Sequence, residues 1–167
     1  MSASIEWTPA QVQDSIDALK HKPGALLPIL HAIQERIGHI PADSVPIIAE
    51  SMNLTRAEVH GVISFYHHFR TTPPGRHVIQ VCRAEACQAM GGRQLEAHVK
   101  TRLGIDYDAT TSDGGISLEP IYCLGNCACA PNISVDERVH GRMDTARFDA
   151  LFDDLSDALQ TQMLEVK

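Results

Sequence analysis

Apolar residues in the first part of the chain recur every three or four positions, a spacing that predicts a series of helices. The first helix has clear start signals: Thr8 as N-cap, Pro9 at the first helical position and Gln11 completing a capping box. Its apolar positions then follow at helical spacing: Val12, Ile16 and Leu19. A second helix should begin near Gly24 and stop at Gly38, with an apolar stripe of Leu26, Leu30, Ile33 and Ile37.

Two further helices are expected before residue 70. A short one should run from about Asp43 to Met52. The next should start at Thr55, because Glu58 follows three residues later and completes a second capping box. Its expected buried face consists of Val59, Val62, Ile63 and Tyr66. Together the helices predict a helical bundle for this part of the chain.

The pattern changes at residues 71–75, which hold two threonines, two prolines and a glycine. We therefore expect an N-terminal helical domain at residues 1–75 and a second domain at residues 76–167. The second domain should contain a strand at 77–81, a helix at 92–103 that stops at Gly104, and a strand at 116–122. A hairpin is expected from 132–135 and 139–143 around a turn at 136–138. The last helix should begin near Asp144 or Thr145, with a core face of Phe148, Leu151, Phe152, Leu155 and Leu159. This order predicts a small α/β or α+β sandwich.

Composition narrows the classes of function. The formal net charge of −7 argues against a nucleic-acid binder, which usually presents a basic face. The first residues show no export signal, and no apolar run approaches the roughly 18 residues of a membrane span. We therefore expect a soluble, cytoplasmic protein with no membrane partner. Because the cytosol keeps thiols reduced, the five cysteines suggest metal or redox chemistry rather than disulfides.

Four of the cysteines form two spaced pairs, Cys82-x4-Cys87 and Cys123-x3-Cys127. Each pair follows a predicted strand, so each should lie on a loop at a strand end, where two loops can converge. Gly91, Gly92 and Gly125 lie close by, and glycine lets the backbone approach a ligand and turn N–H groups toward bound sulfur.

Several kinds of site use cysteines in this way. A structural zinc site takes four cysteines, but usually in closer pairs. A catalytic dithiol favours a C-x-x-C motif, which is absent. Buried cysteines that act as small hydrophobes would explain neither the pairing nor the glycines. A four-residue gap does occur in plant-type [2Fe-2S] proteins, although their remaining spacing is not found here.

The two pairs, with Leu124, Gly125 and Asn126 inside the second, resemble the thioredoxin-like [2Fe-2S] ferredoxin family, which includes the 24 kDa subunit of respiratory complex I. Residues 59–66 resemble the helical domain of that family, so the likeness covers nearly the whole chain. The resemblance implies an α+β protein: an N-terminal helical bundle followed by a thioredoxin-like α/β domain. It also implies one [2Fe-2S] cluster per chain, held by Cys82, Cys87, Cys123 and Cys127. Cys129 lies outside the motif and is expected to be a free, packed thiol.

Two stretches, 82–92 and 119–131, resemble the branch formed by the γ subunits of soluble, molybdenum-containing, NAD-dependent formate dehydrogenases. This likeness implies a non-catalytic electron-transfer subunit beside a flavin- and NAD-binding β subunit, with a molybdenum-containing α subunit in the same complex. FMN, NAD and the molybdenum cofactor would then be bound only by the partner subunits. The equivalent subunit of complex I or of an NAD-reducing hydrogenase is one alternative, and a zinc-stapled interaction domain is another.

Other features favour simpler interpretations. Adjacent residues on a helix do not face each other, so His67 and His68 make a poor metal chelate and are expected on the surface or in packing. Residues 54–59 could begin a DNA-recognition helix, but the acidic balance favours an ordinary capped bundle helix. The last helix carries several acidic residues, which suggest a solvated face or a docking face for a basic partner: Asp149, Asp153, Asp154 and Asp157.

Overall fold

The computed structural model describes the backbone of residues 7–165 and the side chains as far as Ser156. The chain divides into two compact units, the first ending at Pro74 and the second beginning at Gly75. Each unit has its own apolar core. They are therefore described separately.

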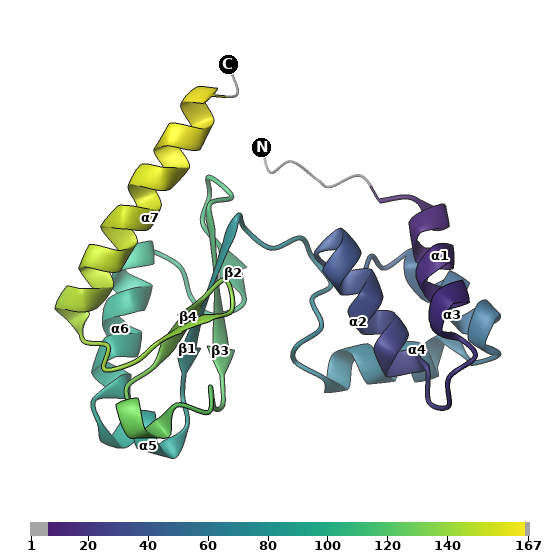
Figure 1. Ribbon diagram of the computed structural model, residues 1–167, viewed down its shortest axis with the longest axis horizontal. Coiled ribbons are helices and arrows are strands. Elements are labelled where there is room, and N and C mark those ends of the chain that lie inside the picture. Colours follow the sequence, from purple (N-terminus) through teal and green to yellow (C-terminus); the bar gives the residue numbers. More distant parts are fainter. Residues whose placement is uncertain (1–6, 166–167) are drawn as a thin grey trace. The chain divides into compact units, whose positions relative to one another are not determined.

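The first unit is a bundle of four helices, α1 (Pro9–Leu19), α2 (Leu26–Ile37), α3 (Ser44–Met52) and α4 (Arg56–Phe65) (Figure 1). Both predicted capping boxes are present, at Thr8 with Gln11 and at Thr55 with Glu58. Helix α2 ends as expected at Gly38, whose φ of 88° is a left-handed conformation that glycine adopts without strain. These signals confirm all four predicted helices.

Apolar residues from all four helices fill the core of this bundle. Val59 and Ile63 of α4 are buried as predicted. Tyr66 is a correction: it lies just past the end of α4 in an extended conformation, and 43% of its surface is exposed. The helical spacing predicted a buried Tyr66 only because it assumed that the helix continues through this residue.

The second unit is built on a five-stranded mixed sheet in the order β2-β3-β1-β4-β5. Its strands are β1 (His77–Cys82), β2 (Ala109–Thr110), β3 (Ile116–Ile121), β4 (Ile133–Val135) and β5 (Arg138–His140). Strands β1 and β3 run parallel, and the remaining pairs are antiparallel. The predicted strands and hairpin are confirmed, whereas β2 was not predicted because two residues carry no periodicity.

The hairpin turn is one residue shorter than expected. Arg138 pairs with Val135 inside the ladder, which leaves only Asp136 and Glu137 in the turn. Their φ angles of 47° and 69° are both positive, as a two-residue turn that follows the twist of its strands requires. The Asp136 carboxylate accepts the backbone N–H of Val78 at 2.9 Å, which ties this turn to β1.

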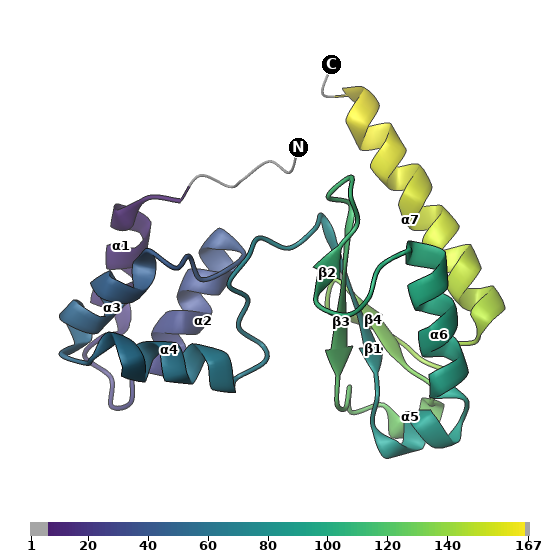
Figure 2. The same ribbon diagram turned by 180° about the vertical axis from the view of Figure 1, so that it is seen from behind.

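Helices α6 (Gly92–Leu103) and α7 (Thr145–Glu165) lie side by side on one face of the sheet (Figures 1 and 2). Between them and the sheet lies the second core, which includes Ile79, Val81, Leu95, Val99 and Phe148. Leu151, Phe152 and Leu155 pack against this core as predicted. The side chain of Leu159, also expected there, lies outside the described residues. The architecture is therefore α+β, as predicted.

Two short helical segments lie near the cysteines. Helix α5 (Glu85–Ala89) follows β1 and contains Cys87, so the loop predicted between the first two cysteines is partly helical. A 3-10 turn, η1, spans Cys127–Cys129. Figure 1 shows α5 at the end of the sheet toward which β1 and β3 run. Of the helices in the described part of the chain, none is both long and apolar enough to cross a membrane.

Candidate metal centre

The parallel pairing of β1 and β3 brings the two cysteine pairs to one edge of the sheet. Cys82, the last residue of β1, lies opposite Ile121, the last residue of β3. The backbone N–H of Arg83 donates to the Ile121 carbonyl at 2.7 Å, which holds the two strand ends together. Cys123 follows only two residues after Ile121. Loops that leave the carboxyl ends of two paired parallel strands start side by side, so the predicted convergence is found.

The second pair is already arranged as ligands of one metal ion would be. The Sγ atoms of Cys123 and Cys127 lie 3.7 Å apart, and both residues are exposed. A tetrahedral metal with metal–sulfur bonds of about 2.3 Å places two of its sulfur ligands roughly 3.8 Å apart. The backbone N–H of Gly125, at a positive φ of 75°, donates to Cys123 Sγ at 3.3 Å. This is the role expected of Gly125.

The first pair is buried beside the second. Cys82 and Cys87 are both almost completely inaccessible to solvent. Burial raises the pKa of the Cys82 thiol, the neighbouring Cys87 raises it further, and the backbone N–H groups of Ala84 and Leu124 oppose the rise. Leu124 belongs to the loop of the second pair, so its N–H ties that loop to the first pair.

An electrostatic interaction also links the two cysteine pairs. The pKa of the Cys127 thiol is raised chiefly by Cys123, with a further contribution from Cys87. Neighbouring thiolates repel one another, so the charged form of Cys127 is disfavoured. A bound cation relieves this repulsion, which is why metal binding and thiol deprotonation are linked.

The arrangement favours a two-metal cluster over a single zinc ion. Within the described residues, no three Cys, His, Asp or Glu side chains surround a point that one metal ion could occupy. A tetrahedral zinc site would need all four sulfurs around one point. The Cys123–Cys127 pair, with its sulfurs 3.7 Å apart, and the neighbouring Cys82–Cys87 pair instead suit a cluster in which each iron takes two thiolates.

Glycines shape this site in different ways. A Cβ atom at Gly92 would lie 2.5 Å from the carbonyl oxygen of Cys87, so only glycine allows α6 to start this close to α5. Gly91 has a positive φ of 94° and donates its N–H to the Gln88 carbonyl rather than to sulfur. The prediction that all three glycines turn N–H groups toward sulfur is therefore wrong for Gly91.

Asn132 is a site residue that the sequence did not reveal. Its side chain is buried immediately before β4, and its Nδ2 donates to Cys87 Sγ at 3.4 Å. The same side chain exchanges two hydrogen bonds with Asn126, which lies between Cys123 and Cys127. A single asparagine after a proline carries no periodic or motif signal, so only the fold identifies it.

Cys129 is partly buried at the end of η1. Its backbone carbonyl accepts the N–H of Arg142, and its Cβ would lie 2.8 Å from a Cβ at Gly141. The residue is therefore packed against the segment after β5. That Cys129 lies outside the ligand set stays a prediction.

The other candidate residues have structural partners. The ring of His68 lies 5.2 Å from that of His31, in a cluster of rings with Phe69, as expected of a packing histidine. In α7, Asp149 pairs with His98 and Asp153 with Arg102, each at 2.8 Å. These two acidic residues thus hold α7 to α6, while the side chain of Asp157 lies outside the described residues.

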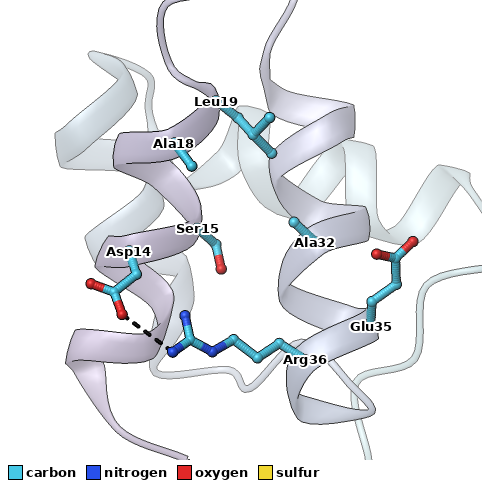
Figure 3. A pocket seen from close by; sticks show the side chains of 7 residues that line it. All are labelled: Asp14, Ser15, Ala18, Leu19, Ala32, Glu35 and Arg36. Atoms are coloured by element: carbon cyan, nitrogen blue, oxygen red, sulfur yellow. Dashed lines mark hydrogen bonds and ion pairs between the residues drawn. The ribbon is translucent and has the colours of Figure 1, made fainter.

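A hollow between α1 and α2 has no cysteine in its lining. The Arg36 guanidinium crosses it to the Asp14 carboxylate at 3.2 Å, whereas Glu35 points away (Figure 3). Arg36 also donates to the Gln11 carbonyl, and the Ser15 hydroxyl donates to the same oxygen. These polar groups satisfy one another, so the hollow is best explained as the packing of the two helices.

Comparison with known proteins identifies the family. The pattern described as thioredoxin-like [2Fe-2S] ferredoxin matches residues 12–156, which include most of each unit and all four paired cysteines. The chain belongs to this family. Members of the thioredoxin-like [2Fe-2S] ferredoxin family carry one [2Fe-2S] cluster, so the cofactor expected from the sequence is confirmed, as is the thioredoxin-like fold.

The alignments with relatives cover most of the chain. It is 35% identical over 133 residues to the HndA subunit of the NADP-reducing hydrogenase of Solidesulfovibrio fructosivorans, covering 80% of this chain and 78% of the relative. It is 35% identical over 141 residues to a subunit of the NADH-quinone oxidoreductase of Rhizobium meliloti, covering 84% of each. A crystal structure of an NAD+-reducing [NiFe]-hydrogenase aligns with 80% of the chain at a TM-score of 0.67 and 26% identity. The chain spans only 23% of that hydrogenase chain.

Proposed function

We propose that this chain is a non-catalytic electron-transfer subunit that holds its [2Fe-2S] cluster on Cys82, Cys87, Cys123 and Cys127. The observation that carries the assignment is the convergence of a buried and an exposed cysteine pair at the carboxyl ends of β1 and β3. Four thiolates, two for each iron, are the usual ligand set of a [2Fe-2S] cluster. When bound, the cluster supplies a one-electron redox couple.

The protein around the cysteines suits that chemistry. The N–H groups of Gly125, Ala84 and Leu124 are directed at sulfur, where they stabilise negative charge. Cys82 and Cys87 close the inner side of the site against water. Cys123 and Cys127 are exposed, and Tyr122 beside them has 60% of its surface accessible. A redox partner would therefore approach from the side of the second pair.

Relatives support an NAD(P)-linked complex as the setting. The NADP-reducing hydrogenase, the NADH-quinone oxidoreductase and the NAD+-reducing hydrogenase all bear names of enzymes that use a nicotinamide cofactor. Within such a complex the direct neighbour of this chain would be a flavin subunit. The flavin exchanges two electrons as hydride with NAD, and a [2Fe-2S] cluster beside it exchanges electrons singly.

For the enzyme itself we propose an NAD-dependent formate dehydrogenase. The support is the likeness of stretches 82–92 and 119–131 to the γ subunits of the soluble, molybdenum-containing enzymes. The partners would be a flavin- and NAD-binding β subunit with FMN, and an α subunit with the molybdenum cofactor. The proposal also places the chain in the cytoplasm, where its five cysteines, none of them in a disulfide, would stay reduced.

The names of the relatives favour a second candidate, the equivalent subunit of an NAD(P)-linked hydrogenase or of complex I. Affinity purification of the tagged chain from its native cells under anaerobic conditions distinguishes the candidates. Mass spectrometry should find a flavin subunit and a molybdenum subunit, with formate-dependent NAD+ reduction in the same fraction. Recovery of a hydrogenase catalytic subunit or of quinone-reductase subunits instead would refute the formate dehydrogenase assignment and support the second candidate.

The isolated chain tests the non-catalytic role. Purified alone with its cluster, it should neither oxidise formate nor reduce NAD+. Together with the flavin subunit it should form a stable pair that passes electrons from NADH to an artificial acceptor. Formate-dependent NAD+ reduction by this chain with no other subunit detectable would overturn the proposal.

A further inference from the structure

Asn132 connects the three segments that carry the paired cysteines. Its backbone carbonyl accepts the N–H of Cys82 at 3.1 Å. Its side-chain Nδ2 lies 3.4 Å from Cys87 Sγ and 2.9 Å from the backbone carbonyl oxygen of Asn126. Its Oδ1 accepts from Nδ2 of Asn126 at 2.9 Å. With 1% of its surface exposed, Asn132 has little contact with water that could replace these bonds.

These partners fix the direction of the Asn132 amide. A backbone carbonyl oxygen can only accept, so the group facing the Asn126 carbonyl must be the NH2 and not the oxygen. The NH2 has two hydrogens. One is used on the Asn126 carbonyl, and the second is directed at Cys87 Sγ. Rotating the amide by half a turn would bring its oxygen against the Asn126 carbonyl and its NH2 against the Asn126 amide group, losing both bonds.

We propose that Asn132 is a positioning residue that donates an N–H···S hydrogen bond to the Cys87 ligand and thereby raises the reduction potential of the cluster. The inference rests on the cluster ligands proposed above. Reduction adds one negative charge to the cluster and its thiolates. A donor to a charged acceptor is stronger than one to a neutral acceptor, so the bond strengthens as negative charge on sulfur increases. It therefore stabilises the reduced state more than the oxidised state.

Burial enlarges this effect. The Cys87 thiol is 1% exposed, so water does not compete for its lone pairs or screen the amide dipole. Asn126 holds the amide in place from the other side, which prevents it from rotating away as the charge changes. The same bonds couple the loop of Cys123 and Cys127 to the buried pair. Asn132 thus fixes the position of the Cys123–Cys127 loop relative to the buried cysteine pair and also raises the reduction potential of the cluster.

The first experiment uses the unaltered protein. The chain has only three asparagines, Asn53, Asn126 and Asn132. Protein grown with asparagine labelled with nitrogen-15 in the side-chain amide, purified anaerobically, is first analysed for iron and then reduced. Pulsed paramagnetic resonance should detect a nitrogen-15 coupling to the cluster. Absence of iron would overturn the ligand assignment itself, whereas a reduced cluster with no such coupling would overturn only the role of Asn132.

The second experiment compares two variants. Asn132→Leu removes the amide at similar volume, and it should lower the reduction potential and abolish the nitrogen-15 coupling although Asn53 and Asn126 remain labelled. Ser134→Ala is the matched control. Ser134 is also 1% exposed, lies two residues further along the chain in β4, and donates to the side chain of Gln80 rather than to a thiol. It should leave the potential unchanged.

Two results would contradict the proposal: an unchanged potential in Asn132→Leu, or a coupling that persists in that variant. If Asn132→Leu does not assemble a cluster, the labelled unaltered protein still tests the proposal, because a reduced cluster with no nitrogen-15 coupling contradicts it.

Discussion

Cys82 and Ile121 face each other as the last residues of the parallel strands β1 and β3. This register explains why cysteines about 40 positions apart can share a site. The chain that leaves β1 enters α5, which holds Cys87, and the chain that leaves β3 reaches Cys123 within two residues. A shift of one residue in this register would turn every side chain of one strand to the other face. The sheet core and the cysteine site therefore depend on the same pairing.

Anaerobically purified protein should contain about two irons and two acid-labile sulfides per chain, as expected of one [2Fe-2S] cluster. Reduction with dithionite should give one S = 1/2 paramagnetic signal. The structure supports this count because the four paired cysteines form two adjacent pairs rather than one set around a point. Stoichiometric zinc without iron in the same preparation would show that the cysteines form a structural zinc site.

Single alanine substitutions should separate the four paired cysteines from the fifth. Replacing Cys82, Cys87, Cys123 or Cys127 should abolish the visible absorbance of the cluster or strongly reduce it. Cys129→Ala should keep it, because Cys129 packs against Gly141 at the far end of η1. Iron content and absorption spectra provide the measurement. If Cys129→Ala lost the cluster and Cys127→Ala kept it, the ligand assignment would have to change.

The sequence predicted helix ends best where a local capping motif satisfies the backbone groups at the end of the helix. The capping boxes at Thr8 and Thr55 and the left-handed stops at Gly38 and Gly104 each satisfy helix-terminal groups, and each fixed a helix end correctly. The prediction that Tyr66 is buried was wrong because helical spacing does not show where a helix ends when no such stop signal is present. Segments such as α5 and β2 are too short for any period to be visible.

Parts of the candidate site could also be predicted from the sequence, whereas other parts could not. Cysteine spacing and strand order predicted the convergence of Cys82 and Cys123, because loops after parallel strands must emerge at one edge. The burial of one pair and the exposure of the other could not be predicted, since they depend on where α5 and η1 pack. The role of Asn132 could not be predicted for the same reason, because its partners lie 45 positions away at Cys87 and 6 positions away at Asn126.

Acidification should weaken the helical unit through His39. This side chain is only 7% exposed, and burial lowers its pKa from the ordinary value of 6.5. The unfolded chain therefore binds a proton at His39 more readily than the folded chain. Stability is fully present above about pH 6.5 and falls as the pH drops toward the lowered pKa of the folded state.

Urea unfolding of the full chain at pH 7.5 and 5.5, followed by fluorescence, measures this effect. Trp7 is the only tryptophan and packs against the core of the helical unit, so its emission reports on that unit. The unfolding free energy should be smaller at pH 5.5, and His39→Gln should reduce the difference between the two pH values. His60→Gln, at an exposed position of α4, is the control and should leave the difference unchanged. An equal pH dependence in both variants would exclude His39 as its source.

Gly92 should be essential for the cluster although it contacts no sulfur. A Cβ at this position would lie 2.5 Å from the carbonyl oxygen and 2.8 Å from the carbonyl carbon of Cys87. Backbone atoms at such distances must move, and here the movement displaces a cluster ligand. Gly92→Ala should therefore lower the iron content per chain and the intensity of the paramagnetic signal. The helical unit, followed by Trp7 fluorescence, should unfold at the same urea concentration as before.

Gly61→Ala is the matched control for this substitution. Gly61 lies inside α4, and a Cβ there would meet no atom within 4 Å. Alanine in the interior of a helix is favoured over glycine by about 0.5–1 kcal/mol, so this variant should keep the cluster and unfold at a slightly higher urea concentration. Full iron content in Gly92→Ala would mean that α5 and α6 can separate without moving Cys87.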